Sequence, residues 1–315
     1  MAETVLTEQQ GRVLIVRLSN PPHNFMNRAM VLELEDLLER LEGDDSVGAV
    51  VLTGEPPDSF ITHYDVGEIL RGSEQIGREL PPSVAGPALR ASGAISKLPG
   101  GRDALLRSPA GGLVELRRIH DVFARMNALD KVLIAAINGV ATGGGCELAL
   151  ACDLRLISSE GGPIGLPEMT LGIIPGAGGT QRMTRLLGAG KALELILEGR
   201  TLGPAEAVEA GLVHRVVEAA GLLPEAIATA ERLSRRSPAS VAAAKRAVYE
   251  GGSGSLEHGL HVERAAFMSV AASPPALRAM REYERELSEG GQPPWRDPDA
   301  IRRWQDGTAT DLWAD

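Results

Sequence analysis

Three consecutive glycines, Gly143 to Gly145, stand where an apolar run meets a segment of small residues. Because glycine has no Cβ atom, the backbone at such a turn can come close to a ligand, so Gly143 is a candidate substrate-binding residue. The N–H groups of a following helix would point back toward the turn, and the helix dipole adds partial positive charge there. Such N–H groups could stabilise a developing oxyanion.

Glu147 follows the glycines and falls in the first turn of the predicted helix. The helix dipole favours the ionised form of an acid at this place, which suits a general base. The alternative is an exposed acid at a helix N-terminus without a chemical role. Composition alone would favour that alternative.

Hydrophobic periodicity predicts the elements that must position these residues. Residues 132–137 form a continuous apolar run, typical of a buried strand that leads into the glycines. Residues 13–18 and 47–53 predict two further strands, and apolar residues at helical spacing predict a helix over 30–41. This succession indicates an α/β fold, and periodicity alone goes no further.

The stretch 138–147 reads Asn-Gly and then Gly-Gly-Gly-x-Glu, and it resembles the crotonase family, the enoyl-CoA hydratases and isomerases. Similar segments follow the family order at 47–54, 165–168, 173–182 and 207–213. A glycine triplet alone would be a weak signal, but this ordered set is specific.

The resemblance implies a fold and an assembly. Residues 1–200 would form a spiral of ββα turns, and residues 201–315 a C-terminal helical region with a polar tail. In relatives this helical region packs subunits together, so a homotrimer or a dimer of trimers is expected.

The resemblance also implies a chemistry. Two carboxylates flank one water and add it across a polarised double bond, one taking a proton while the other gives one. The matching positions are Glu147 and Glu168, and Pro167 would help to aim the second. Two N–H donors would hold the thioester oxygen, with Gly144 and Thr62 at the matching positions.

The segment around Thr62 departs from the family pattern, which reads Phe-x-Ala-Gly-x-Asp. Thr62 replaces the alanine and His63 the glycine, while Tyr64 and Asp65 complete the set of candidate substrate-binding residues here. An imidazole at this place could narrow the acyl pocket or join proton transfer near neutral pH. Alternatively, His63 points away and packs under the segment that follows.

Coenzyme A would bring several phosphate charges to an acidic chain, so local cations must hold it. With only four lysines, arginines must do most of this work. Arg28 follows residues 22–26, which resemble the family's loop near the nucleotide, and both Asn24 and Arg28 are candidate substrate-binding residues. The alternative for Arg28 is a solvated surface position. No cofactor is implied beyond the coenzyme A of the substrate.

The glycine-rich stretch 176–179 looks like a phosphate cradle but lacks the lysine of a P-loop. Packing at a helix start is the better interpretation. His258 and His261 lie three residues apart, but ligand spacing elsewhere is missing, so no metal site is predicted.

Composition limits the class of protein. The chain has 315 residues, 43% of them hydrophobic, and a formal net charge of −10. It can bury a sizeable core, and it offers no basic surface for nucleic acid. No apolar run approaches the roughly 18 residues that a membrane helix needs, and the N-terminus lacks a signal peptide pattern. We therefore expect a cytoplasmic protein without a membrane partner.

Two segments fall outside the family pattern. Residues 72–112 are rich in Gly, Pro, Ser and Ala and look like an insertion, either a lid over the acyl end of the pocket or a poorly ordered loop. Residues 290–315 hold all three tryptophans among polar residues, which suggests that this tail docks on something.

The leading hypothesis is a hydratase that adds water to a trans-2-enoyl-CoA. The nearest rival is an enoyl-CoA isomerase, which can work with one glutamate; another crotonase-type CoA-thioester reaction is a further alternative. A non-catalytic acyl-CoA-binding protein is the hypothesis from a different class.

Overall fold

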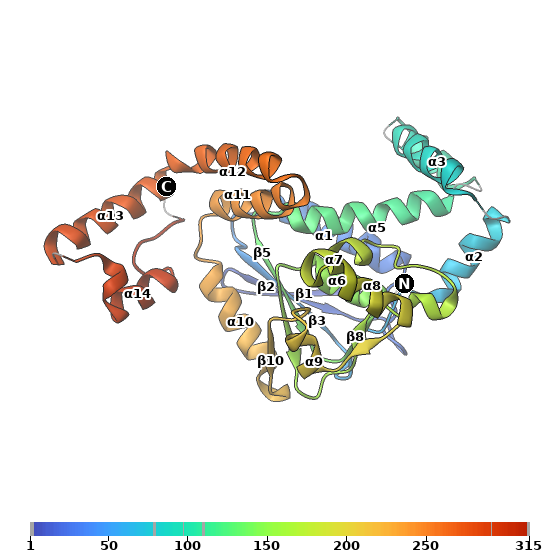
Figure 1. The fold of residues 1–315 in the computed structure, drawn as a ribbon, viewed down its shortest axis with the longest axis horizontal. Coiled ribbons are helices and arrows are strands. Elements are labelled where there is room, and N and C mark those ends of the chain that lie inside the picture. The colour runs from blue at the N-terminus through green and yellow to red at the C-terminus, as the bar shows by residue number, and fades with distance from the viewer. Residues whose placement is uncertain (1–2, 78–79, 97, 109–110, 291, 314–315) are drawn as a thin grey trace.

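Two β-sheets organise the chain in the computed structural model (Figure 1), which describes residues 3–77, 80–96, 98–108, 111–290 and 292–313. The larger sheet has the strand order β1-β2-β3-β5-β7-β10. Its strands are β1 (Val5–Gln10), β2 (Val13–Leu18), β3 (Ala49–Gly54), β5 (Val132–Ile137), β7 (Leu154–Ser158) and β10 (Arg215–Val217). β1 and β2 form an antiparallel hairpin, and the remaining pairs are parallel.

The smaller sheet positions the site. It consists of β4 (Ser59–Ile61), β6 (Val140–Thr142), β8 (Ile164–Gly165) and β9 (Thr201–Leu202). β4 and β6 are parallel neighbours, with Ile61 opposite Ala141. Because parallel strands end at the same edge, the residues after Ile61 and after Thr142 emerge side by side.

Helices cover both faces of the larger sheet. The core on one face includes residues of α1 (Arg28–Leu41), α5 (Gly111–Ala128) and α6 (Gly144–Ala151). Helix α7 (Gly179–Leu187) packs on α6, and α8 (Ala189–Glu198) packs on α7. The other face packs against α10 (Leu222–Leu233). Along β2, Leu14 and Val16 enter the first core while Val13 and Ile15 enter the second. Burial on both sides explains the continuous apolar runs, and the predicted strands and the helix over 30–41 are confirmed.

The insertion is helical where it is described. Residues 72–112 comprise the end of α2 (Val66–Ile76), then α3 (Pro82–Ile95) and α4 (Gly101–Leu106), while residues 78–79, 97 and 109–110 lie outside the described residues. α3 and α4 both contact α5, and α3 lies on the outer side of the molecule, away from the sheets (Figure 1). The Arg117 guanidinium of α5 lies over Gly93 of α3, in the space that a side chain at Gly93 would occupy. A lid function for this segment stays a prediction.

The core continues past residue 200, where we expected the helical region to begin. β10 pairs with β7, and Leu222, Ala226 and Ala230 of α10 fill the second core.

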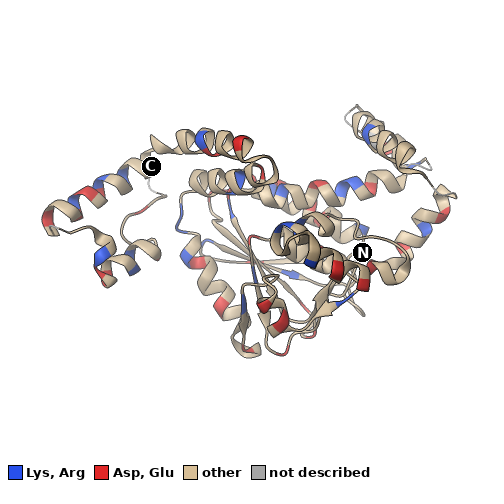
Figure 2. Cartoon of the chain, viewed as in Figure 1, with Lys and Arg blue, Asp and Glu red and all other residues tan. Residues whose placement is uncertain are grey.

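The remaining helices are α9 (Pro204–Glu209), α11 (Pro238–Tyr249), α12 (Leu256–Ala271), α13 (Pro274–Gly290) and α14 (Pro298–Gln305). None of the helices in the described part of the chain is long and apolar enough to cross a membrane. In the view of Figure 2, acidic and basic residues alternate along α13.

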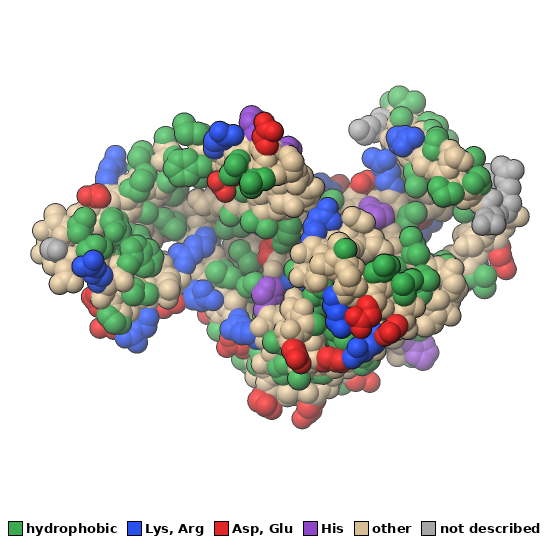
Figure 3. Space-filling view, in the orientation of Figure 1, with side chains coloured by type: hydrophobic (Ala, Val, Ile, Leu, Met, Phe, Trp, Pro, Cys, Tyr) green, Lys and Arg blue, Asp and Glu red, His purple; other side chains and the backbone are tan. Residues whose placement is uncertain are grey.

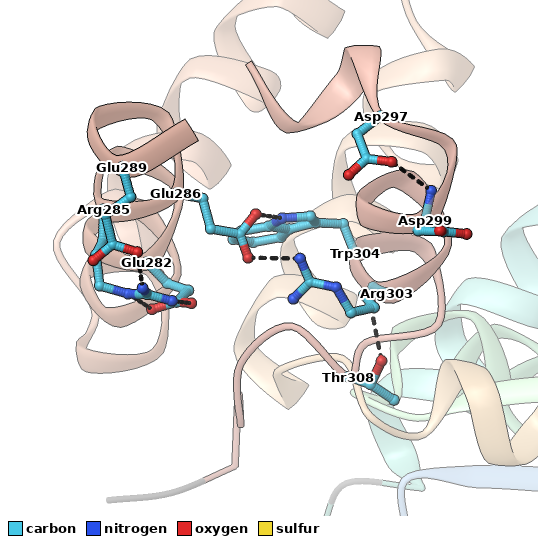
Figure 4. Close-up of polar contacts among 9 residues, drawn as sticks. All are labelled: Glu282, Arg285, Glu286, Glu289, Asp297, Asp299, Arg303, Trp304 and Thr308. Atoms are coloured by element: carbon cyan, nitrogen blue, oxygen red, sulfur yellow. Dashed lines mark hydrogen bonds and ion pairs between the residues drawn. The ribbon is translucent and has the colours of Figure 1, made fainter. Parts of the chain in front are cut away.

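The tail docks on its own chain. The indole N–H of Trp304 donates to Oε2 of Glu286 at 3.1 Å, and Arg303 pairs with the same carboxylate, which ties α14 to α13 (Figure 4). The indole N–H of Trp313 donates to the carbonyl of Ser234 at 2.8 Å, and the Arg12 guanidinium lies 3.2 Å from the centre of its ring. These contacts confirm that the tail is docked.

Replacement of Trp313 tests this docking. Trp313→Ala should lower the free energy of unfolding by about 1–2 kcal/mol, because it removes one hydrogen bond and one cation–π contact. Urea unfolding followed by circular dichroism measures the change. The matched control is Trp295→Ala, at a residue that is 53% exposed, which should change stability by less than about 0.5 kcal/mol. Equal effects of the two substitutions would contradict the docking.

Candidate active site

The turn after β6 brings the backbone against Glu168. Gly143 adopts φ 51°, and its N–H donates to the carbonyl of Gly165 at 2.9 Å. A Cβ atom at Gly143 would lie 3.2 Å from Oε1 of Glu168. Both the positive φ and this close approach favour glycine here, and they place the turn of the triplet beside the second predicted catalytic residue.

Glu147 lies in the first turn of α6, as predicted, and it is only 3% exposed. Its Oε1 accepts hydrogen bonds from the N–H groups of Ala177 at 2.7 Å and Gly179 at 2.8 Å. Burial raises the pKa of Glu147, while these two N–H groups and the charge of Arg182 act in the opposite direction. The interpretation as an exposed helix-terminal acid was therefore wrong.

Glu168 follows β8 at the start of a short 3₁₀ turn, Glu168–Leu171. Its Oε2 is buried and has no hydrogen-bond partner among the described residues. Burial raises the pKa of Glu168 from 4.5 to about 7, and the charge of Glu147 adds to this effect. Glu168 can therefore hold a proton near neutral pH, whereas an ordinary solvated glutamate would have lost it.

The backbones of Gly144 and Tyr64 face each other. A Cβ atom at Gly144 would lie 3.2 Å from both N and Cβ of Tyr64. Gly144 is the first residue of α6, so its N–H has no partner within the helix. The N–H of Tyr64 also makes no hydrogen bond to the described part of the chain. Neither N–H has a partner among the described residues, so two available donors lie next to one another.

The predicted donor Thr62 needs correction. Its N–H donates to the carbonyl of Asn24 at 3.2 Å, and its carbonyl accepts the N–H of Thr142 at 3.0 Å. Its hydroxyl donates to the carbonyl of His23 at 2.6 Å. Thr62 therefore holds the neighbouring segments together, and its N–H is already used.

Asn24 is also committed to the fold. It is fully buried with φ 52°, its amide donates to the carbonyl of Phe60 at 2.8 Å, and its Oδ1 accepts the N–H of Asn20 at 2.8 Å. Asn24 therefore shapes the loop before α1.

His63 stacks on Phe25, with ring centroids 4.3 Å apart. Its Nδ1 lies 2.7 Å from the carbonyl oxygen of Tyr64. A carbonyl can only accept, so Nδ1 carries a hydrogen in this contact. The stacking partner belongs to the loop before α1 rather than to residues 72–112.

Asp65 and Arg28 lie at helix starts. Asp65 caps α2, with Oδ1 accepting the N–H of Gly67 at 2.7 Å. Nε of Arg28 lies 3.2 Å from a carboxylate oxygen of Glu115, and about half of the Arg28 side chain (49%) is exposed. A coenzyme A phosphate would have to compete with Glu115 for this guanidinium.

Sequence reasoning missed the donors that hold Glu147. The stretch 176–179 was interpreted as packing at a helix start, and α7 does begin at Gly179. The same turn also supplies two N–H groups to the carboxylate. A buried carboxylate requires donors, so a glycine-rich turn nearby was the available signal. Within the described residues there is no cluster of three metal-ligating side chains.

Comparison with known proteins agrees with this geometry. Residues 8–82 and 115–298 match the family described as enoyl-CoA hydratase/isomerase, which leaves out most of α3 and all of α4. A probable enoyl-CoA hydratase of Rhizobium meliloti is 36% identical over 282 residues, which cover 89% of this chain and 95% of the relative. A short-chain-enoyl-CoA hydratase of Clostridium acetobutylicum is 32% identical, with 91% and 97% covered.

A crystal structure of an enoyl-CoA hydratase from Bacillus anthracis has a TM-score of 0.72 at 29% identity and covers 90% of this chain and 97% of that one. The strand order, the glycine turn and both glutamates thus occur in a chain that matches the family along most of its length. The protein belongs to the enoyl-CoA hydratase/isomerase family, the crotonases, and has their fold.

Proposed function

We propose that this protein adds water to a trans-2-enoyl-CoA thioester to give a 3-hydroxyacyl-CoA. Family membership supports a crotonase-type reaction on a CoA thioester. The observation that carries the finer proposal is the pair of glutamates in unlike environments, Glu147 held by two N–H groups and Glu168 with a pKa of about 7. Hydration needs one group that takes a proton and one that gives a proton.

The residues divide the reaction between them. Glu147 takes a proton from water as the water oxygen bonds to C3 of the substrate. The C2–C3 π electrons shift toward the thioester, whose oxygen becomes an enolate held by the N–H groups of Gly144 and Tyr64. Glu168 then gives its proton to C2. Exchange of protons with solvent returns both carboxyl groups to their starting states.

An isomerase would use one carboxylate to move a proton between carbons, and a binding protein would use neither. Oε2 of Glu168 has no hydrogen-bond partner among the described residues, whereas Oε1 of Glu147 accepts two N–H groups. This difference favours a reaction in which both carboxyl groups take part. Absorbance of the conjugated enoyl thioester separates the three cases. A hydratase bleaches the band, an isomerase raises it from a 3-enoyl substrate, and a binding protein leaves it unchanged.

Amide replacement tests both acids. Glu147→Gln and Glu168→Gln should each lower kcat for hydration at least about a hundredfold, because general acid–base groups contribute roughly 10²–10⁴. Glu160→Gln, at an exposed acid after β7, is the control and should retain full activity. Near-normal turnover by either folded site variant would remove that residue from the mechanism.

The pKa of Glu168 predicts a pH dependence of stability. Between pH 4.5 and about 7 the folded protein keeps a proton that the unfolded chain has released, so stability falls as pH rises through this window. Glu168→Gln should remove about 1–2 kcal/mol of that fall, after allowance for the partial exposure of the residue. Urea unfolding at pH 5 and pH 8 measures the difference. Identical pH profiles of the two proteins would contradict the raised pKa.

The facing backbones of Gly144 and Tyr64 predict the effect of a side chain between them. Gly144→Val should lower kcat at least about a hundredfold, since loss of an oxyanion donor costs about 3–4 kcal/mol. Affinity for free coenzyme A, measured by calorimetry, should stay within a few-fold. Gly190→Val is the control because a Cβ atom there meets open space. An active Gly144→Val protein would place the carbonyl elsewhere.

We also propose that the chain assembles as a homotrimer or a dimer of trimers and works in the cytoplasm. Large apolar side chains are exposed on α8 and α12, namely Leu193, Leu197, Leu256, Phe267 and Met268. Figure 3 shows apolar side chains gathered over α12. Burial of this surface between subunits would remove it from water. Light scattering should give three or six chain masses, and a monomer at micromolar concentration would exclude the assembly.

A further inference from the structure

We propose that Tyr64 and Glu68 form a positioning pair that fixes the second oxyanion N–H. This inference rests on the function proposed above. Tyr64 supplies the N–H that faces Gly144, and its phenol donates to Oε2 of Glu68 at 2.9 Å. One residue therefore carries both the donor and an anchor for it.

The anchor is joined to two helices. Glu68 lies in the first turn of α2, where the helix dipole favours its carboxylate form. The same Oε2 that accepts the Tyr64 hydroxyl also accepts the N–H of Arg28 at 2.9 Å, at the start of α1. Glu68 thus connects the donor turn with the beginnings of α1 and α2.

An ion-pair network extends this anchor into the core. Arg28 pairs with Glu115 of α5 at 3.2 Å, and Glu115 also pairs with Arg118 at 2.9 Å. Arg118 is only 5% exposed and pairs with Glu35 of α1 at 3.1 Å. Partly buried pairs of this kind are screened less than surface pairs, so the network can hold α1 and α5 in place beneath Glu68.

The backbone on both sides of the donor is also held. The carbonyl of His63 accepts the N–H of Met26 at 2.9 Å, and the N–H of Asp65 donates to the carbonyl of Met26 at 2.7 Å. The Tyr64 ring packs against the hydrophobic core. Burial raises the pKa of the phenol, as does the charge of Glu68, so the hydroxyl stays a donor throughout the neutral range. The phenol contact with Glu68 therefore acts together with these backbone bonds in holding the Tyr64 peptide.

A second tyrosine provides a matched comparison. The hydroxyl of Tyr249 in α11 donates to Oδ1 of Asp153 at 2.8 Å, and burial followed by the charge of Asp153 raises its pKa. The chemistry equals that of Tyr64 and Glu68, but Tyr249 has no part in the proposed site. A purely structural role predicts the same outcome for both tyrosines.

The test compares Tyr64→Phe, Glu68→Ala, the double variant and Tyr249→Phe. Tyr64→Phe and Glu68→Ala should each lower kcat for enoyl-CoA hydration about five- to tenfold with KM within about twofold, the pattern of a lost transition-state contact. The double variant should be no slower than Glu68→Ala alone, because Glu68→Ala already removes the hydrogen bond that Tyr64→Phe breaks. Glu68→Gln keeps an acceptor and should retain at least about half of kcat. Tyr249→Phe should lower the Tm and leave kcat unchanged.

A spectroscopic readout separates this inference from the proposed reaction. The probe is a cinnamoyl-CoA with an electron-donating para-amino group, whose absorption moves to longer wavelength when its carbonyl oxygen accepts hydrogen bonds. The wild type and Tyr249→Phe should show the full shift, and Tyr64→Phe and Glu68→Ala a smaller one. If the wild type hydrates enoyl-CoA but Tyr64→Phe keeps both its kcat and the full shift, the positioning role is wrong. If the wild type shifts the probe but does not hydrate, the proposed function fails, and the shift still decides the positioning role.

Discussion

The approach of two backbones at the ends of parallel strands is the constraint on which the site depends. β4 and β6 run side by side, and a Cβ atom at Gly145 would lie 2.0 Å from the carbonyl oxygen of Ile61. Only glycine allows the strand ends to meet at this distance. The meeting of the strand ends places the N–H groups of Gly144 and Tyr64 next to each other, so sheet geometry brings the two donors together.

The same turn leads to two glutamates whose surroundings differ. Glu147 is nearly fully buried, and the cost of its desolvation is offset in part by the N–H groups of Ala177 and Gly179. Glu168 has a buried oxygen without a partner among the described residues, so its protonated form is favoured near neutral pH. Environment alone can thus give two residues of one type opposite tasks in proton transfer.

Much of this could be predicted from sequence, because strands buried on both faces and a glycine triplet leave local signals. Glu147 and Glu168 were found at the places that the family pattern indicated, and the structure puts both beside the triplet. The prediction of Thr62 as a donor was wrong because residues distant in the sequence decide which N–H groups already have a hydrogen-bond partner. The carbonyl of Asn24, 38 residues away in sequence, takes the N–H of Thr62 and leaves that of Tyr64. The spacing of residues in the sequence cannot show which carbonyl group accepts a given N–H in the folded chain.

The insertion shows why such a site tolerates added chain. The insertion lies between two fixed helices. Asp65 caps α2, which precedes it, and Phe123 and Met126 of α5, which follows it, are buried in the core. The entropy cost of a longer connection grows only slowly with length, so α3 and α4 can be added between two fixed ends at little cost. Both α3 and α4 pack against α5. Glu115 of α5 in turn forms an ion pair with Arg28 at the start of α1. Helix α5 thus packs against α3 and α4, while its buried face packs in the core and its Glu115 pairs with Arg28 near the site.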